Sequence, residues 1–288
     1  MTVRTAVTAG PSMSLSDKDI IVDGVRLAYR DRGDGPPVVF LHGTPSYSYE
    51  WRDVVPHVEA AGYRTLTYDL LGYGDSERPV DRDTSVTAQA ELLVELLDEL
   101  DLARVNLVSH DIGGAIGQRL AIDWPERVHR LLLIDTVSYD SWPSATWRQI
   151  IRDNLDDHAA MSAAEFERML TRQLQMTVSD ANRMRGEVLE AYLAPHRSAL
   201  GRASFFDHQV RHYDSAHTES LTARLGDLDL PVRILWGGRD QWQPVSYAER
   251  LTADIPGAEL VVLPEAGHFV MEDDAAAVTR EVLDFLAA

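Results

Sequence analysis

The chain has 288 residues, with 27 Lys and Arg against 46 Asp and Glu, and therefore a formal net charge of −19. A surface this acidic repels phosphate backbones and anionic lipids, so nucleic acids and membranes are not expected as partners. The sequence contains no cysteine, which excludes a disulfide scaffold, a thiolate metal site and a cysteine nucleophile.

Residues 1–16 are rich in Thr, Ala and Ser, and we expect them to form a flexible tail. They lack the apolar run of about 7–15 residues that a secretory signal needs. No stretch of the chain approaches the ~20 consecutive apolar residues of a membrane-spanning helix. These observations predict a cytoplasmic protein.

The rest of the chain alternates between two kinds of apolar pattern. Asp23-Gly24 lies between apolar residues in the segment 19–30, which predicts a β-hairpin. The short continuous apolar run over residues 37–41 predicts a strand buried on both faces, and further strands are predicted over residues 64–68, 105–108, 128–134, 232–236 and 259–263. Apolar residues at helical spacing predict helices over about residues 49–60, 89–100, 113–124, 247–254 and 275–286.

This alternation predicts an α/β fold in which helices flank a mostly parallel sheet. Residues 17–135 and 229–288 would form that core. Residues 136–228 break the alternation, because they are polar, helical in pattern and rich in Arg, His and aromatic residues. We therefore expect an inserted helical cap over the core. Ligand sites in such sheets form at the carboxyl ends of the strands.

The stretch VSHDIGG joins a predicted strand to a predicted helix and has Asp111 at its centre. A sharp strand-to-helix turn presents its central side chain above the sheet and needs small neighbours, here Ser109 and Gly113. The helix N-terminus would also stabilise an anion at this point. The alternative interpretation is that Asp111 is an ordinary helix N-cap.

A second turn, HGTP, follows the strand predicted over residues 37–41 and contains His42 and Thr44. It could direct the Thr44 N–H toward Asp111. Together with the Ile112 N–H it would form a two-donor oxyanion hole. The alternative is a plain Gly-Pro turn.

Histidine and carboxylate side chains follow three other predicted strands. His268, in AGHF, is a candidate general base. Asp240, in WGGRD, could orient the imidazole and stabilise its charged form. Asp135, at the end of LLLID, is the alternative acid. We favour Asp240.

The chain order of Asp111, Asp240 and His268 is the order of nucleophile, acid and histidine in α/β-hydrolase sheets. The segments HGTPSYSYEWR, YDLLGYGDSERP, SHDIGGAIGQRLA, WGGRDQWQP and EAGHFVMED resemble the α/β-hydrolase superfamily. They are most similar to its aspartate-nucleophile branch, which includes haloalkane dehalogenases and epoxide hydrolases. The resemblance implies an α/β-hydrolase core with a helical cap.

An aspartate nucleophile predicts chemistry at a saturated carbon. A carboxylate can displace a leaving group there and form an alkyl ester on Asp111. Water activated by His268 would then hydrolyse that ester, with the new oxyanion held by the Thr44 and Ile112 N–H groups. This route needs no cofactor. No metal is expected either, because the cap histidines (His208, His212 and His217) match no known metal-site spacing. The expected partners are water and a small apolar organic molecule, with the protein a monomer or homodimer.

The enzymes of the aspartate-nucleophile branch differ in their leaving group. For this chain we favour an epoxide, whose ring opens to give a diol. Cap tyrosines donate the proton in the epoxide hydrolases that the sequence resembles, and Tyr213, Tyr139 and Tyr192 are the candidates here. Trp142 could line the pocket. Fluoroacetate dehalogenases have arginines where this chain has Ile112 and Ala115, so we reject that activity.

Two alternatives remain open. A haloalkane dehalogenase is possible, although Ile112 and Thr44 replace the usual halide donors, so its halide site would be non-standard and built from Trp142 or Tyr213. A protein that binds ligand without hydrolysis is the second alternative. The combination of Asp111, His268 and Asp240 argues against it, because a silent pocket does not need all three.

Overall fold

The computed structural model describes residues 14–288. Most of the expected tail, residues 1–16, lies outside the described residues. Within them, no helix combines the length and the apolar character needed to cross a membrane.

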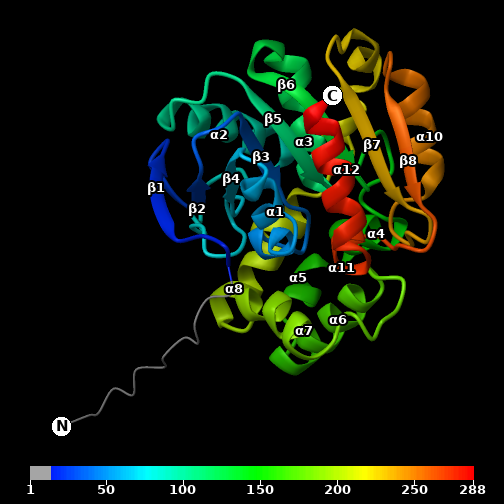
Figure 1. Ribbon diagram of the computed structural model, residues 1–288. Helices are drawn as coiled ribbons and strands as arrows, with labels where there is room; N and C mark the ends of the chain where they lie inside the picture. Colours follow the sequence, from blue (N-terminus) through cyan, green and yellow to red (C-terminus); the bar gives the residue numbers. More distant parts are fainter. Residues whose placement is uncertain (1–13) are drawn as a thin grey trace.

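An eight-stranded sheet forms the centre of the molecule (Figure 1), with the strand order β1-β2-β4-β3-β5-β6-β7-β8. The strands β1 and β2 form the predicted hairpin, β2 also pairs antiparallel with β4, and all other pairs are parallel. The strand bounds are Lys18–Val22, Val25–Arg32, Pro37–Leu41, Arg64–Tyr68, Val105–His110, Val128–Ile134, Val232–Gly237 and Glu259–Leu263 for β1 to β8. The predicted mostly parallel α/β sheet is confirmed.

Helices flank this sheet, and all the predicted core helices except the one over residues 49–60 are present as single helices. The helix α1 packs against β4 and α12, while α2 and α3 pack against each other and α10 packs against β7 and β8. Their bounds are Val55–Ala60 for α1, Val86–Glu99 for α2, Ile112–Asp123 for α3, Val245–Asp254 for α10, Val270–Asp273 for α11 and Ala275–Ala287 for α12.

The helix expected over residues 49–60 is the main departure in the core. It is divided into a 3-10 turn, η1 (Ser48–Trp51), and the short helix α1. Pro56 explains the division, because its ring excludes the preceding helical turn but fits the first turn of a new helix. The prediction of one continuous helix there is wrong.

The segment between β6 and β7 folds into a series of helices, and α5, α6, α7 and α8 lie together below the sheet in Figure 1. We call residues 136–228 the inserted segment. Outside this segment, a short 3-10 turn, η2 (Pro125–Arg127), precedes β6. The inserted segment contains α4 (Ala145–Asp153), α5 (Leu155–Ala159), α6 (Ala163–Gln175), α7 (Gly186–Leu193), η3 (Ala194–His196), α8 (Ala199–Ser204), η4 (Phe205–Gln209), η5 (Val210–His212), α9 (Ala216–Glu219) and η6 (Thr222–Asp227).

The candidate residues follow the carboxyl ends of the parallel strands. Thr44 comes soon after β3, Asp111 directly after β5 and Asp135 directly after β6. Asp240 and His268 follow β7 and β8. Because these strand ends meet at one edge of a parallel sheet, five residues spread over much of the chain are gathered in one place.

Candidate active site

Asp111 occupies a strained turn between β5 and α3. Its backbone has φ 50° and ψ −119°, a conformation that is uncommon for any residue other than glycine. Asp111 stands at the N-cap position of α3, but its side chain makes no capping hydrogen bond, so it is not an ordinary helix N-cap. The turn is tightly enclosed: a Cβ at Gly113 would lie 2.6 Å from the Leu41 carbonyl oxygen, and a Cβ at Gly114 would overlap Thr136.

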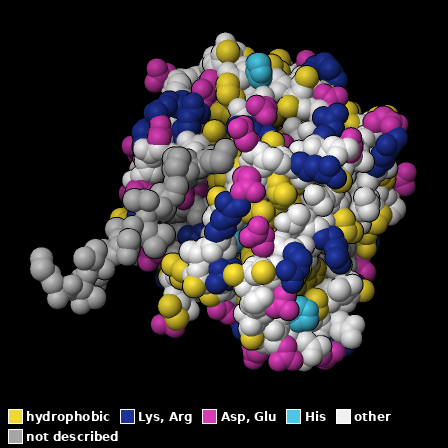
Figure 2. All heavy atoms as spheres, turned by 90° about the horizontal axis from the view of Figure 1, so that it is seen from below, with side chains coloured by type: hydrophobic (Ala, Val, Ile, Leu, Met, Phe, Trp, Pro, Cys, Tyr) yellow, Lys and Arg dark blue, Asp and Glu magenta, His cyan; other side chains and the backbone are white. Residues whose placement is uncertain are grey.

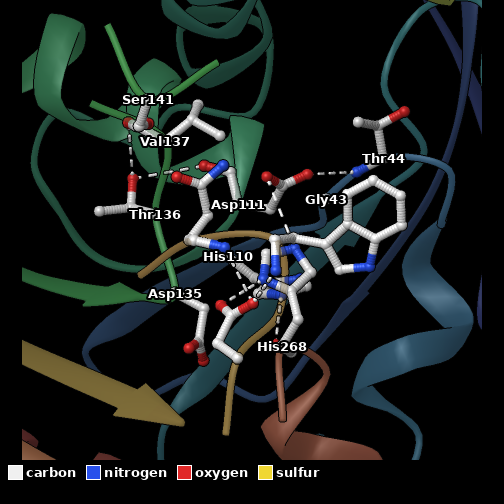
Figure 3. Close-up of polar contacts among 12 residues, drawn as sticks. Gly43, Thr44, His110, Asp111, Asp135, Thr136, Val137, Ser141 and His268 are labelled. Atoms are coloured by element: carbon white, nitrogen blue, oxygen red, sulfur yellow. Dashed lines mark hydrogen bonds and ion pairs between the residues drawn. The ribbon is translucent and has the colours of Figure 1, made fainter. Parts of the chain in front are cut away.

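The two carboxylate oxygens of Asp111 have different surroundings. Oδ2 accepts a hydrogen bond from the Thr44 N–H at 2.8 Å, and the Ile112 N–H also hydrogen-bonds the carboxylate. Oδ1 lies 3.7 Å from His268 Nε2. Figure 3 shows Asp111 between the Thr44 amide and His268. Burial raises the pKa of Asp111, while His268, His110 and the two amides act in the opposite direction.

His268 is joined to Asp240 on its other side. Its Nδ1 lies 2.8 Å from Asp240 Oδ2. The other Asp240 oxygen accepts the N–H groups of Trp242 at 2.7 Å and Gln243 at 2.9 Å, so the carboxylate has a fixed orientation. Burial acts to lower the pKa of His268, but Asp240, Asp111 and Glu50 outweigh it and the pKa is raised. Asp111, His268 and Asp240 thus have the relative geometry of a nucleophile, base and orienting acid.

Asp135 lies beside this group but does not replace Asp240 in it. Its Oδ1 accepts the Gly237 N–H at 2.8 Å, and its buried Oδ2 has no hydrogen-bond partner. Burial, followed by the neighbouring charge of Asp240, raises the pKa of Asp135 well above its ordinary value. Burial thus favours the neutral form of Asp135, and the carboxylate that contacts His268 is that of Asp240.

Two carboxylates and an imidazole close together are also a possible metal-ligand set. Oxygen and nitrogen atoms of Asp135, Asp240 and His268 lie within 4.8 Å of one another. However, His268 Nδ1 and Asp240 Oδ2 are only 2.8 Å apart. Two ligands of one tetrahedral zinc ion, each at ~2.0 Å, stand ~3.3 Å apart. The geometry matches a direct hydrogen bond rather than a metal site.

A cavity lies in front of Asp111 and His268. Core residues and the inserted segment both contribute to its wall, which mixes aromatic and polar side chains. Its lining residues are Thr44, Pro45, Asp111, Ser141, Trp142, Ser144, Trp147, Gln173, Thr177, Phe205, Tyr213, Trp242, Gln243 and His268. The expected pocket residues Trp142 and Tyr213 are among them, and their rings pack with centroids 4.7 Å apart.

Three other candidate residues lie elsewhere. The Tyr139 hydroxyl donates to Asp254 at 2.7 Å and the Tyr192 hydroxyl to Glu272 at 2.7 Å, and neither tyrosine lines the cavity. The structure therefore does not bring Tyr139 to the site. His42 is buried behind it, where Nδ1 donates to the Gly43 carbonyl at 2.8 Å and Nε2 accepts the Leu70 N–H at 2.9 Å. Burial lowers the pKa of His42, so its neutral ring stabilises the turn that carries Thr44.

Two supporting groups were not identified from the sequence. Glu50 and His110 form a fully buried pair behind the site, with 3.2 Å between Oε1 and Nδ1, and His110 Nε2 lies 3.1 Å from the His268 carbonyl oxygen. Asp273 accepts the Gly267 N–H at 2.6 Å and the Ser179 N–H at 2.8 Å. It thereby joins the loop of His268 to the inserted segment. Glu50 and Asp273 lie a few residues after HGTP and AGHF, and His110 lies within VSHDIGG, but spacing alone does not reveal such pairings.

Known proteins of several activities resemble this chain. The 2-hydroxy-6-oxononadienedioate/2-hydroxy-6-oxononatrienedioate hydrolase of Cupriavidus pinatubonensis is 28% identical over 291 residues, which cover 99% of this chain and 98% of that protein. Haloalkane dehalogenase 2 of Mycobacterium bovis is 26% identical over 265 residues, covering 90% of this chain and 91% of the dehalogenase.

Solved structures agree with the fold. An α/β hydrolase fold protein from Burkholderia ambifaria superimposes with a TM-score of 0.87 at 32% identity, covering 93% of this chain and 97% of that one. The epoxide hydrolase CorEH gives a TM-score of 0.79 at 25% identity, covering 94% and 98%. The family model for the alpha/beta hydrolase fold matches residues 36–275, which is most of the chain. The protein therefore belongs to the α/β hydrolase fold family, and it is a hydrolase.

Proposed function

We propose that this hydrolase opens an epoxide to a diol through a covalent ester on Asp111. The main support for the proposal is that the two oxygens of the Asp111 carboxylate have different contacts. Asp111 Oδ2 is hydrogen-bonded to the Thr44 amide at 2.8 Å, while Oδ1 lies 3.7 Å from His268 Nε2 at the cavity wall. A carboxylate held in this way suits attack on a saturated carbon.

In the first step, Asp111 Oδ1 bonds to an epoxide carbon and the carbon–oxygen bond of the ring breaks. The electron pair moves to the ring oxygen, which takes a proton from Tyr213. The support for this role is that Tyr213, alone among the three tyrosines considered, lines the cavity of Asp111 in the described chain. Such a positioned acid contributes about 10²- to 10⁴-fold to a rate.

In the second step, His268 removes a proton from water and the oxygen of that water attacks the ester carbon. Esterification has by then removed the negative charge of Asp111, which is one of the causes of the raised pKa of His268. The pKa of His268 falls at this stage, so the neutral imidazole becomes available as a base. The oxyanion that forms on Asp111 takes hydrogen bonds from the Thr44 and Ile112 N–H groups. Collapse of the adduct releases the diol.

The cavity favours a neutral, mainly apolar substrate. In the described part of the chain its wall contains five large aromatic groups, Trp142, Trp147, Phe205, Tyr213 and Trp242, and neither Lys nor Arg. A dioate, the substrate class in the name of the Cupriavidus relative, carries two negative charges. With Asp111 in the wall and neither Lys nor Arg to pair with them, such charges would be poorly compensated.

Carbon–halogen hydrolysis is a second candidate, and one observation favours it. The indole Nε1 of Trp242, a cavity residue, is buried and has no hydrogen-bond partner. An indole N–H is a donor that a departing halide could use. The likeness to haloalkane dehalogenase 2 adds to this candidate. The same Asp111 ester would form, and only the leaving group would differ.

Trapping the ester tests the proposal. We expect a His268→Gln variant incubated with styrene oxide to accumulate an adduct on the Asp111 peptide, detected by mass spectrometry, because the second step lacks its base. Asp111→Asn is the matched control and should give none. Wild-type protein should release diol from styrene oxide. Bromide release from 1-bromobutane without diol formation would favour the second candidate, and absence of any adduct with either substrate would overturn both.

A further inference from the structure

The hydroxyl group of Thr44 has no role in the mechanism above, although the Thr44 N–H does. Its Oγ1 contacts the hydroxyl groups of two tyrosines, and the shorter contact, 2.6 Å, is with Tyr213. Tyr73 donates to the same oxygen at 3.5 Å, and Gln209 Oε1 accepts from it at 3.5 Å. One side chain thus connects the turn that holds Asp111 to the proton donor proposed for the ring oxygen.

The surroundings determine which way these protons can point. The Gln209 amide donates through Nε2 to the Gly72 carbonyl at 3.4 Å, which leaves its Oε1 as the acceptor facing Thr44. In the resting state Tyr213 can donate to Thr44, and Thr44 to Gln209. A threonine hydroxyl can rotate and reverse these roles. It can then donate to Tyr213, which frees the phenol O–H for the cavity.

We propose that the Thr44 hydroxyl is a positioning group that orients the Tyr213 hydroxyl and donates a hydrogen bond to its phenolate when the epoxide ring opens. This inference rests on the proposed function and extends it.

Electron pairs and protons are conserved over the two steps of the reaction. The Asp111 Oδ1 electron pair forms the new bond to carbon, and the ring oxygen leaves with the pair of the broken bond. Tyr213 transfers its proton to that oxygen and becomes a phenolate, to which the Thr44 O–H donates. In the hydrolytic step His268 takes one proton from water, and that proton returns to Tyr213 to complete the cycle.

A phenolate at this position needs such a partner. Tyr213 is only 9% exposed. Burial raises the pKa of Tyr213 well above its ordinary value and the charge of Tyr73 adds to this, whereas the Thr44 hydrogen bond lowers it. Removing that hydrogen bond would leave a buried anion with less compensation. Hydrogen bonds to charged groups are worth enough to change a rate by about 10- to 100-fold.

Single-turnover kinetics with styrene oxide test the inference, since they separate formation of the Asp111 ester from its hydrolysis. Thr44→Val keeps the backbone N–H and the size of the side chain but removes the hydroxyl. We expect it to slow ester formation by about 10- to 100-fold and to slow hydrolysis much less. Thr44→Ser, which restores the hydroxyl, should recover most of the rate.

Tyr213→Phe provides the second arm. If Thr44 acts through Tyr213, the Thr44→Val change should have little further effect on ester formation in a Tyr213→Phe background. Ester formation at the wild-type rate in Thr44→Val, failure of Thr44→Ser to recover the rate, or a full additional loss in the double variant would each overturn the inference. In all three cases wild-type protein still forms the ester, so the proposed function stands. Absence of the wild-type ester refutes the proposed function itself.

Discussion

At the scale of single residues, the choice between two acids is the main point that geometry resolves. Asp135 and Asp240 both follow strands of the same sheet, so each could be placed near His268 from the sequence. In the structure Asp240 Oδ2 is 2.8 Å from His268 Nδ1, whereas Asp135 is hydrogen-bonded to the Gly237 amide. The sequence-based preference for Asp240 agrees with this geometry, and its role in catalysis stays a prediction.

Isosteric amides at the two positions test that role. We expect Asp240→Asn to lower kcat by about 10²- to 10⁴-fold, because a neutral amide cannot stabilise the charged imidazole of His268 and its NH2 group can hold Nδ1 in the wrong tautomer. Asp135→Asn should keep activity within about 3-fold, since His268 is hydrogen-bonded to Asp240 instead and an amide oxygen can still accept the Gly237 N–H. Steady-state kinetics on styrene oxide compare them. A larger loss in Asp135→Asn than in Asp240→Asn would reverse the assignment.

The stability of the same Asp135→Asn variant provides a further test, because its difference from wild type should depend on pH. The pKa of Asp135 is raised in the folded state. Asp135 therefore contributes most to the stability of the folded wild-type protein at a pH below its unfolded-state pKa of about 3.9. That contribution to the free energy of unfolding is lost as the pH rises through the folded-state pKa. Asparagine does not titrate. The stability of the variant relative to wild type should therefore increase from pH 4 to pH 9 in urea unfolding, and a constant difference would contradict the raised pKa of Asp135.

At the scale of elements, the short apolar runs identified the strands because a strand buried on both faces must be continuously apolar. In β3, with the sequence PVVFL, the last four of the five residues are buried. Helix ends were less well predicted, because they depend on single capping residues and prolines. Ser85 begins α2 three residues earlier than expected by accepting the Ala88 N–H, and Pro56 divides the helix expected over residues 49–60.

The junction of β5, α3 and β6 allows a direct test of the tight turn at Asp111. Gly114→Ala would place a methyl group onto the Thr136 side chain, and we expect it to lower the free energy of unfolding by about 1–3 kcal/mol. Gly226→Ala is the matched control, because the nearest atom to its new Cβ is 3.9 Å away. Its free energy of unfolding should change by less than about 0.5 kcal/mol. Denaturant unfolding of both variants provides the measurement, and equal midpoints would contradict the close contact.

At the scale of the whole molecule, the formal net charge is −19. Figure 2 shows Asp and Glu side chains interspersed with Lys and Arg on the face seen from below. A net charge of this sign repels anions over a distance set by the ionic strength. Inside the cavity, Asp111 adds repulsion to any bound carboxylate.

This field predicts discrimination between charged and neutral epoxides. Sodium glycidate and methyl glycidate share one reacting ring and differ in one negative charge. We expect kcat/KM for the anion to be lower by about 10-fold or more at low salt, and the difference to narrow as salt is added, because screening shortens the reach of the field. Rates measured from ~10 mM to ~500 mM NaCl test this prediction, because over that range the Debye length falls from about 30 Å to about 4 Å. Equal rates at low salt would contradict the prediction, and the neutral ester serves as the salt control.

The sequence by itself determined the fold and the order of the functional residues, because both depend on local patterns. Apolar runs, turn glycines and the motifs around Asp111, Asp240 and His268 are each readable within a few residues. The tertiary structure alone decided which tyrosine reaches the cavity, which acid contacts His268, and that Thr44 contacts Tyr213. Those pairs are separated by up to 169 residues. Such contacts depend on how the inserted segment packs against the sheet edge, and no local periodicity encodes that packing.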